Sequence, residues 1–133
     1  MTYHLQIVTP DGQRYDGQAV RMIVPTIDGQ VGILARHINF VTALGMGPAK
    51  LVTEDGERYA ACIGGMLAVT DGEVKVVATT FEWADEIDVE RAKASLARAE
   101  KMLADPACDE QTKQYANARM KRAQVRLGIA GKK

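Results

Sequence analysis

The chain has 133 residues, 47% of them hydrophobic and 26% charged, and its 17 basic and 17 acidic side chains give no net charge. A chain of this length forms one compact unit, or one domain with an appendage. The balanced charge and an aromatic content of 5% argue against a nucleic-acid binder. No stretch approaches the run of about 20 apolar residues that a membrane span needs. We therefore expect a cytosolic protein, or one lying against a membrane complex from the cytosolic side.

The first 80 residues are predicted to form short strands. Tyr3, Leu5 and Ile7 alternate with their neighbours in the period-two pattern of a strand with one buried face. Gly64-Gly65 precedes another apolar run and indicates a bulge or a close backbone approach. Asp-Gly pairs, which suit tight hairpin turns, occur at 11–12, 28–29, 55–56 and 71–72. Many short strands without intervening helices predict an antiparallel sandwich or barrel.

The segment 82–127 has a different composition, with no glycine and a single proline, Pro106. Asp88 and Asp109 are placed to cap two helices, Pro106 to end the first and Gly128 to end the second. Apolar residues recur at helical spacing, at Val89, Ala92, Leu96, Ala99 and Leu103, and again at Ala116, Met120, Ala123 and Leu127. Both stripes are narrow and rich in alanine, so we expect an antiparallel helical hairpin that is marginally stable by itself.

Arginines gather on one face of each predicted helix. Arg91 and Arg98 share a face of the first helix, and Arg119, Arg122 and Arg126 share a face of the second. None has an acidic partner at a favourable spacing in its own helix, and Arg122 and Arg126 form a repulsive i,i+4 pair. One interpretation is an anion that binds between the converging guanidinium groups. The other is an ordinary solvated helix surface.

The sequence predicts no catalytic machinery and no metal site. The two histidines, His4 and His37, lie in no recognisable motif with a nucleophile. No glycine-rich loop precedes a helix, which excludes the common phosphate-binding motifs. Cys62 and Cys108 share no motif spacing and are interpreted as incidental thiols.

Several motifs together resemble the epsilon subunit of the F-type ATP synthases, over essentially the whole chain. The resemblance is carried by residues 28–34 with His37, and by 64–69, 74–78, 87–92 and 121–127. Ala35-Arg36 stands where this family usually has Pro-Gly, and Asn39 stands where proline is common. These departures concern the conformation of one loop.

The resemblance implies an N-terminal antiparallel β-sandwich of about ten strands in residues 1–84, followed by a C-terminal α-helical hairpin in 85–133. Members of this family are non-catalytic subunits of a proton- or sodium-translocating complex. They bind the gamma subunit and the c-ring in the central stalk, peripherally on the cytoplasmic side of the plasma membrane and without insertion. The extended basic hairpin meets the catalytic beta subunits and blocks ATP hydrolysis. The residues expected to dock on gamma and the c-ring are Gln30, Gly32, Ile33 and His37.

In some bacterial members the folded-down hairpin binds ATP as a regulatory ligand. The matching residues here are Glu82, Ile87, Asp88, Arg91, Ala92, Arg98, Arg122 and Arg126. The carboxylates are expected to accept hydrogen bonds from the adenine amino group or the ribose, and the arginines to hold phosphates. Arg91 is also a candidate for the inhibitory contact. The alternative function is a free-standing ATP-sensing module with the same fold.

Overall fold

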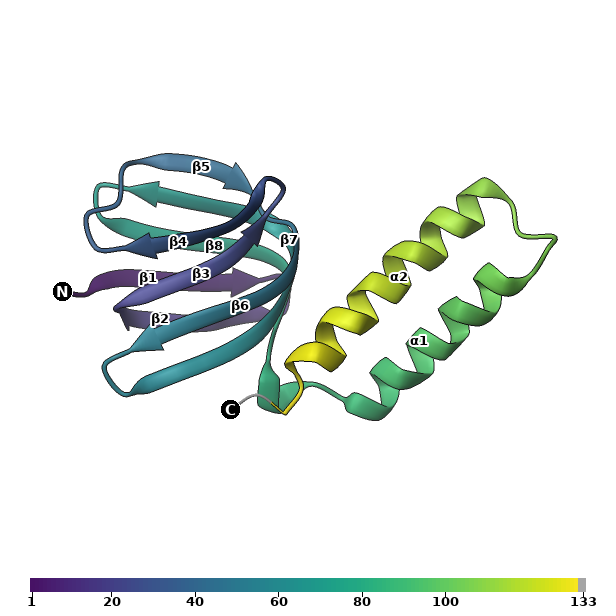
Figure 1. Ribbon diagram of the computed structural model, residues 1–133. Coiled ribbons are helices and arrows are strands. Elements are labelled where there is room, and N and C mark those ends of the chain that lie inside the picture. The colour runs from purple at the N-terminus through teal and green to yellow at the C-terminus, as the bar shows by residue number, and fades with distance from the viewer. Residues whose placement is uncertain (132–133) are drawn as a thin grey trace.

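The computed structural model describes residues 1–131, and it consists of a β-sandwich followed by two antiparallel helices (Figure 1). The strands are β1 (Tyr3–Thr9), β2 (Gly12–Ala19), β3 (Arg21–Thr26), β4 (Gly29–Leu34), β5 (Phe40–Ala43), β6 (Met46–Thr53), β7 (Gly56–Thr70) and β8 (Glu73–Trp83). A 3-10 turn, Ala84–Glu86, leads to the helices α1 (Val89–Ala104) and α2 (Glu110–Ile129). The predicted sandwich and hairpin are thereby confirmed, whereas the predicted domain end at Lys133 lies outside the described residues.

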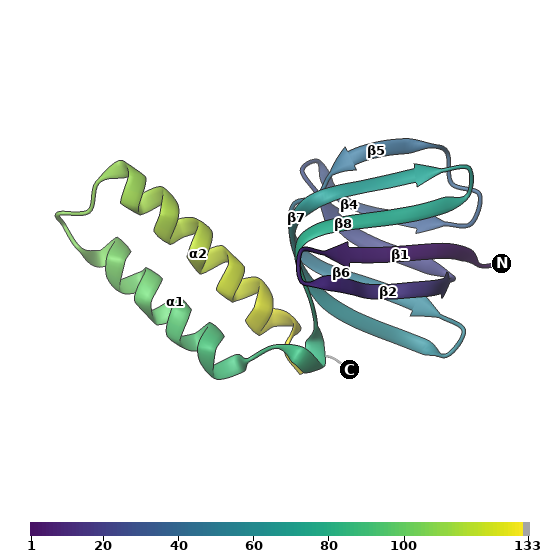
Figure 2. The same cartoon turned by 180° about the vertical axis from the view of Figure 1, so that it is seen from behind.

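One continuous sheet makes both layers of the sandwich. Its strand order is β2-β1-β8-β7-β6-β3-β4, and β5 pairs with β7 outside this path. The sheet curls so that β3, β4 and β6 face β1, β2 and β8, as the front and back views show (Figures 1 and 2). The pairs are antiparallel except for β1 with β8, where Leu5 lies opposite Val74 in a parallel register. The sheet does not close, so β2 and β4 are its edges.

The sandwich has eight strands, fewer than the ten or so expected, because β7 is unusually long. Its 15 residues join two segments, 59–63 and 66–69, that the sequence pattern treats as separate strands. The first half of β7 pairs with β6 and the second half with β5. Between them Gly64 and Gly65 have φ angles of +69° and +120°. A Cβ on Gly65 would lie 2.1 Å from the carbonyl oxygen of Val77, so the predicted close approach is confirmed.

The sandwich encloses the main hydrophobic core, and the alternation seen in the sequence places side chains in it. Tyr3, Leu5 and Ile7 of β1 are all at most 5% exposed. The hydroxyl of Tyr3 donates to the carbonyl of Ile33 at 2.8 Å, and burial raises the pKa of this tyrosine well above its ordinary range. Each buried aliphatic side chain contributes about 1.5–3 kcal/mol relative to exposure. The sandwich therefore holds most of the hydrophobic stabilisation.

Asp-Gly turns connect β1 to β2, β3 to β4, β6 to β7 and β7 to β8, as predicted. A common hydrogen-bond pattern follows from the sequence Thr-x-Asp-Gly, which begins at Thr9, Thr26 and Thr53. In these three turns the threonine Oγ1 accepts from the aspartate amide and donates to the glycine carbonyl. The side chain thus satisfies turn groups that lie outside the sheet ladder.

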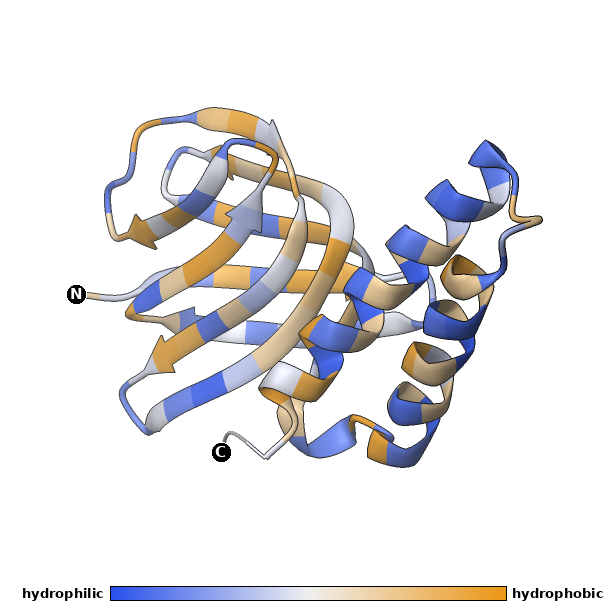
Figure 3. Cartoon of the chain, turned by 45° about the vertical axis from the view of Figure 1, so that its right-hand side comes forward, coloured by the Kyte–Doolittle hydropathy of each residue, from blue (hydrophilic) through white to orange (hydrophobic). Residues whose placement is uncertain are grey.

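The two helices begin where the sequence predicts. The side chain of Asp88 accepts from the amide of Arg91 at 3.0 Å, and that of Asp109 accepts from the amide of Thr112 at 2.7 Å. The helices face each other through small residues that are at most 4% exposed: Ala92, Ala99, Ala116 and Ala123. Hydrophobic colour is correspondingly sparse on the helices and concentrated in the sandwich (Figure 3).

The hairpin meets the sandwich at the C-terminal end of α2, and the loop joining the helices lies at the far end (Figures 1 and 2). A small apolar cluster forms the contact, with Ala61, Ala84, Ile87 and Ile129 buried. Because Ile129 packs in this cluster, α2 runs through Gly128, and the prediction that Gly128 ends the helix is wrong. Within residues 1–131 neither helix combines the length and apolar character needed to span a membrane.

Candidate functional site

A cleft of about 790 Å³ lies between the hairpin and one end of the sandwich. Its walls come from the β1–β2 turn, β7, β8, the segment after β8, and both helices. The charged residues that line it are Arg14, Arg91, Arg98, Arg119, Arg122, Arg126, Asp11, Glu82, Glu86 and Asp88. Arginines therefore outnumber carboxylates in the cleft, although the whole chain has no net charge.

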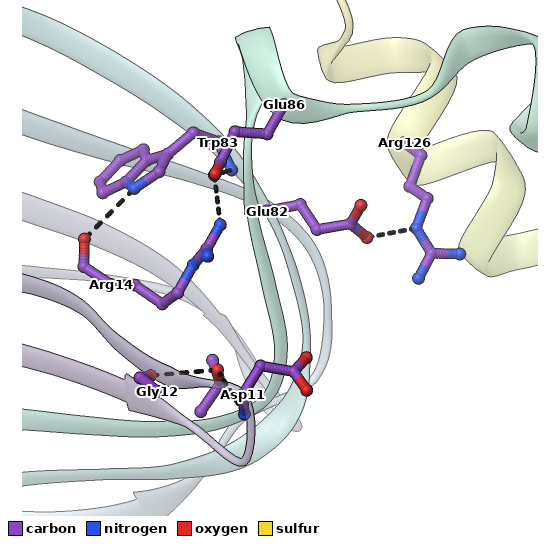
Figure 4. Close-up of polar contacts among 8 residues, drawn as sticks. Asp11, Gly12, Arg14, Glu82, Trp83, Glu86 and Arg126 are labelled. Carbon is purple, nitrogen blue, oxygen red and sulfur yellow. Dashed lines mark hydrogen bonds and ion pairs between the residues drawn. The ribbon is translucent and has the colours of Figure 1, made fainter.

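Glu82 and Arg126, both predicted to contact ATP, form an ion pair with each other (Figure 4). Nε of Arg126 donates to Oε1 of Glu82 at 2.6 Å, and the two side chains are 26% and 29% exposed. Glu82 lies near the end of β8 and Arg126 in the last turn of α2, so the pair links the sandwich to the hairpin. Each group neutralises the other in this conformation.

A second ion pair neutralises the charge of another arginine in the cleft. Arg14 of β2 pairs with Glu86, whose carboxylate also accepts from the backbone amide of Trp83 at 3.2 Å (Figure 4). The indole Nε1 of Trp83 donates to the carbonyl of Arg14 at 3.3 Å. This network fixes the segment between β8 and α1.

Arg91, Arg98 and Arg122 line the cleft, and among residues 1–131 none of them has an ion-pair partner. They come from both helices, so folding brings the two predicted arginine faces to one space. Asp88 also lines the cleft, but one of its oxygens caps α1. The cleft thus presents uncompensated guanidinium groups, which suit phosphate or carboxylate oxygens.

The two apolar residues of the predicted ATP motif lie in different surroundings. Ala92 is 4% exposed and lines the cleft, where its small side chain lets a ligand approach α1. Ile87 is not part of the cleft wall, because its side chain packs with Ala61 and Ile129 in the apolar cluster. Its place in the motif is therefore explained by docking of the hairpin on the sandwich.

Arg119, Ser95 and Tyr115 also line the cleft and were not among the predicted ligands. Nε of Arg119 donates to Oγ of Ser95 at 2.8 Å, and Nη1 donates to the hydroxyl of Tyr115 at 3.2 Å. The spacing of Arg119 from Arg122 and Arg126 marks it as part of the arginine face. The bond to Ser95, across the two helices, has no signal in the sequence.

The residues predicted to bind gamma and the c-ring do not form one loop. Positions 29–34 are the edge strand β4, because the Asp-Gly turn folds them back onto β3. Gln30 and Gly32 are exposed on this strand, whereas Ile33 points the other way and is fully buried. The expectation that the side chain of Ile33 faces a partner is therefore corrected. His37 lies in the loop after β4, half-buried, with its ring 5.0 Å from that of Phe40.

Two family models match the chain, each over one structural unit. Residues 2–84 match the beta-sandwich domain of the ATP synthase delta/epsilon chain, and residues 85–131 match its long alpha-helix domain. An ATP synthase epsilon chain of an Exiguobacterium species is 40% identical over 129 residues, covering 96% of this chain and 95% of that one. The epsilon chain of Shouchella clausii is 36% identical over 129 residues, covering 97% and 95%.

Solved structures show the same fold in larger assemblies. A chain of the Euglena gracilis mitochondrial ATP synthase, in a structure containing F1 and the c-ring, aligns with a TM-score of 0.79 and 22% identity, over 91% of this chain and 76% of that one. A chain from the Tetrahymena thermophila mitochondrial ATP synthase, in its central stalk and c-ring, gives a TM-score of 0.62 and 16% identity over 94% and 93%. Together with the matches to both family models, the curated relatives show that the chain belongs to the epsilon chains of the F-type ATP synthases.

Proposed function

We propose that this chain is a non-catalytic rotor subunit of the central stalk, which joins gamma to the c-ring and regulates ATP hydrolysis through its hairpin. Family membership supports the stalk role, because relatives that cover nearly the whole chain are epsilon chains. The complex translocates protons or sodium ions, and the subunit lies peripherally on the cytoplasmic side of the membrane.

The outer surface of the sandwich offers apolar contacts for gamma. Val41 of β5, Met66 of β7 and Val77 of β8 are 64%, 46% and 45% exposed. Met66 and Val77 are directly opposite each other in the β7–β8 ladder, so they form one continuous patch. Exposed apolar groups on neighbouring strands are typical of a protein–protein contact.

The regulatory role rests on the arginines that both helices direct into the cleft. This cleft exists only while the hairpin lies against the sandwich, since strands and helices each supply part of its wall. An anionic ligand held there stabilises the folded-down hairpin by mass action. We propose ATP as this ligand. When the hairpin extends, the same arginines become available to acidic segments of the catalytic beta subunits.

Calorimetric titration of the isolated chain with ATP tests the regulatory proposal. We expect heat of binding, and a melting temperature that rises with ATP concentration. Arg122→Ala should weaken binding by about 1.5–3 kcal/mol, as for loss of a charged hydrogen bond. Lys101→Ala, which removes an exposed charge of α1 outside the cleft, is the matched control. A titration that releases no heat, together with a melting temperature that ATP does not change, would contradict ATP binding.

Capture of gamma and of a gamma–c-ring assembly tests the stalk role. Met66→Lys and Val77→Lys place charges on exposed positions, so they should leave the sandwich folded and weaken capture of gamma. Gln30→Ala and His37→Ala test the predicted docking residues in the same assay. Glu54→Lys, in the exposed turn between β6 and β7, serves as the control. A wild-type chain that captures neither partner would favour the free-standing ATP sensor.

A further inference from the structure

The two edges of the sheet differ in how they are protected against pairing with another strand. β2 carries charges at Arg14 and Asp16, and its register against β1 shifts between Ile7 and Val8. β4 has the sequence Gly-Gln-Val-Gly-Ile-Leu, without a charge or a proline, and its register against β3 is continuous. Charges, prolines and bulges are the usual devices that keep an edge strand from pairing with another chain. β4 is therefore an unprotected edge.

The backbone groups of Gln30 and Gly32 point toward the free side of β4. The carbonyl of Pro25 accepts from the amide of Gly45, which immediately precedes β6. Because successive residues of a strand direct their backbone groups to opposite sides, Pro25 and Ile23 both direct theirs toward β6 and away from β4. Gln30 and Gly32 lie opposite these two residues in the β3–β4 ladder, so their N–H and C=O groups face outward.

This edge can pair with a second copy of itself, antiparallel and with a two-fold axis at Gly32. In that register Gly32 lies opposite Gly32 of the second copy, and Gln30 lies opposite Leu34. All three positions direct their backbone groups outward, so each opposing pair can exchange hydrogen bonds. A two-fold axis makes every contact twice, and glycine leaves the axis free of side chains.

The same register brings together charges that are unpaired in the single chain. Asp28 and Arg36 are exposed, and within residues 1–131 neither has an ion-pair partner. They lie just beyond the two ends of β4, so Asp28 of each copy comes opposite Arg36 of the other. Ile27 and Ile38, which are 69% and 76% exposed, also flank the strand and come close to each other across the interface.

We propose that two copies of the unassembled chain pair along β4 into one continuous sheet, with ion pairs between Asp28 and Arg36 at both ends. The paired segment is one strand long, roughly 20 Å, so the dimer is weak and depends on concentration. Gln30 and Gly32 are also predicted to dock on gamma and the c-ring. The dimer therefore covers this edge while the chain is free, and stalk partners compete with it. The pairing itself needs only the free chain and does not rest on the proposed stalk role.

Sedimentation equilibrium of the full chain at increasing concentration measures the pairing. We expect the average mass to rise from 14.5 kDa toward twice that value. Gly32→Lys should weaken association by about tenfold or more, because two lysines then lie opposite each other. A Cβ at this position meets nothing closer than Ile23 at 4.0 Å, so the variant should stay folded. Gln13→Lys, which adds the same charge to the other edge strand, should associate as the wild type does. A dimer of wild-type strength in Gly32→Lys would overturn the proposal.

Two charge variants test the register. Asp28→Arg and Arg36→Asp each place like charges opposite one another, so each chain should associate less by itself than the wild type does. An equal mixture of the two variants restores both ion pairs and should form a mixed dimer of about wild-type strength. If the mixture associates no better than its components, the proposed register is wrong.

The remaining occupant of this edge is a strand of a stalk partner. A wild-type chain that stays monomeric at every concentration would overturn the self-pairing. If Gly32→Lys then also weakens capture of gamma or of the gamma–c-ring assembly, β4 belongs to that partner instead.

Discussion

His4 shows how a single residue of the sandwich makes stability depend on pH. Its Nε2 lies 2.5 Å from Asp16 on β2 and its Nδ1 3.6 Å from Glu73 on β8. The hydrogen bond to Asp16 raises the pKa of His4 above its ordinary value of 6.5. A group whose pKa is higher in the folded state stabilises the fold fully below its unfolded pKa, and this contribution is lost as the pH rises through the folded pKa.

We therefore predict that His4→Gln lowers the melting temperature at about pH 5.5 and has little effect at about pH 9. Thermal unfolding of both chains at the two pH values measures this. In an Asp16→Asn background the difference between the pH values should shrink, because the largest cause of the raised pKa is gone. An equal loss at both pH values would show that His4 acts through packing alone.

At the scale of elements, attachment of the hairpin depends on little more than one apolar cluster and one ion pair. Of the ion pairs among residues 1–131, only Glu82–Arg126 joins a strand to α1 or α2. Both groups are partly exposed, so solvent screens the pair. We expect it to stabilise docking by about 1 kcal/mol, between the values for exposed pairs and for charged hydrogen bonds.

Hydrogen exchange of the last turns of α2 measures this docking. Glu82→Gln should accelerate exchange there, and the charge swap Glu82→Arg with Arg126→Glu should restore protection. The swapped chain rebuilds the ion pair but reverses the charges that ATP would meet, so it separates docking from ligand binding. If the swap protects no better than the single variant, the pair does not hold the hairpin.

On the scale of the whole molecule, stability is divided unequally between the two units. Every buried residue of the main core lies between Tyr3 and Trp83, whereas the helices bury mostly alanines. A chain truncated after Ala84 should therefore still unfold cooperatively, with a melting temperature within several degrees of the full chain. Urea and thermal unfolding of both chains are the measurements. Loss of cooperativity in the shorter chain would mean that the hairpin belongs to the same core.

The features that the sequence predicts are those that depend on local patterns. Alternation located the strand that contains Leu5, Asp-Gly pairs located four turns between strands, and Asp88 and Asp109 located both helix starts. The arginine faces followed from helical spacing in the same way. Motif matching placed Ile33 among the docking residues, although its neighbours on β4 and its burial show that it belongs to the core.

Other features depend on how distant segments meet, which no local pattern encodes. The ion pair of Glu82 with Arg126 and the bond of Arg119 to Ser95 join residues far apart in the chain. Each requires the docking angle of the hairpin or the register of the two helices. The same limit applies in part to β7: Gly64-Gly65 predicts a close backbone approach, but only the folded chain shows that the neighbour of Gly65 is the carbonyl group of Val77.

The parallel pairing of β1 with β8 has a consequence for the order in which the chain folds during synthesis. β1 lies between β2 and β8 in the sheet, and Leu5 meets Val74 only after the whole sandwich sequence is available. Such distant contacts form slowly, since a long loop must close first. On the ribosome the sheet therefore stays incomplete until β8 emerges, whereas the helices follow it and need only local contacts. The hairpin is the last part to form, on a sandwich that is already built.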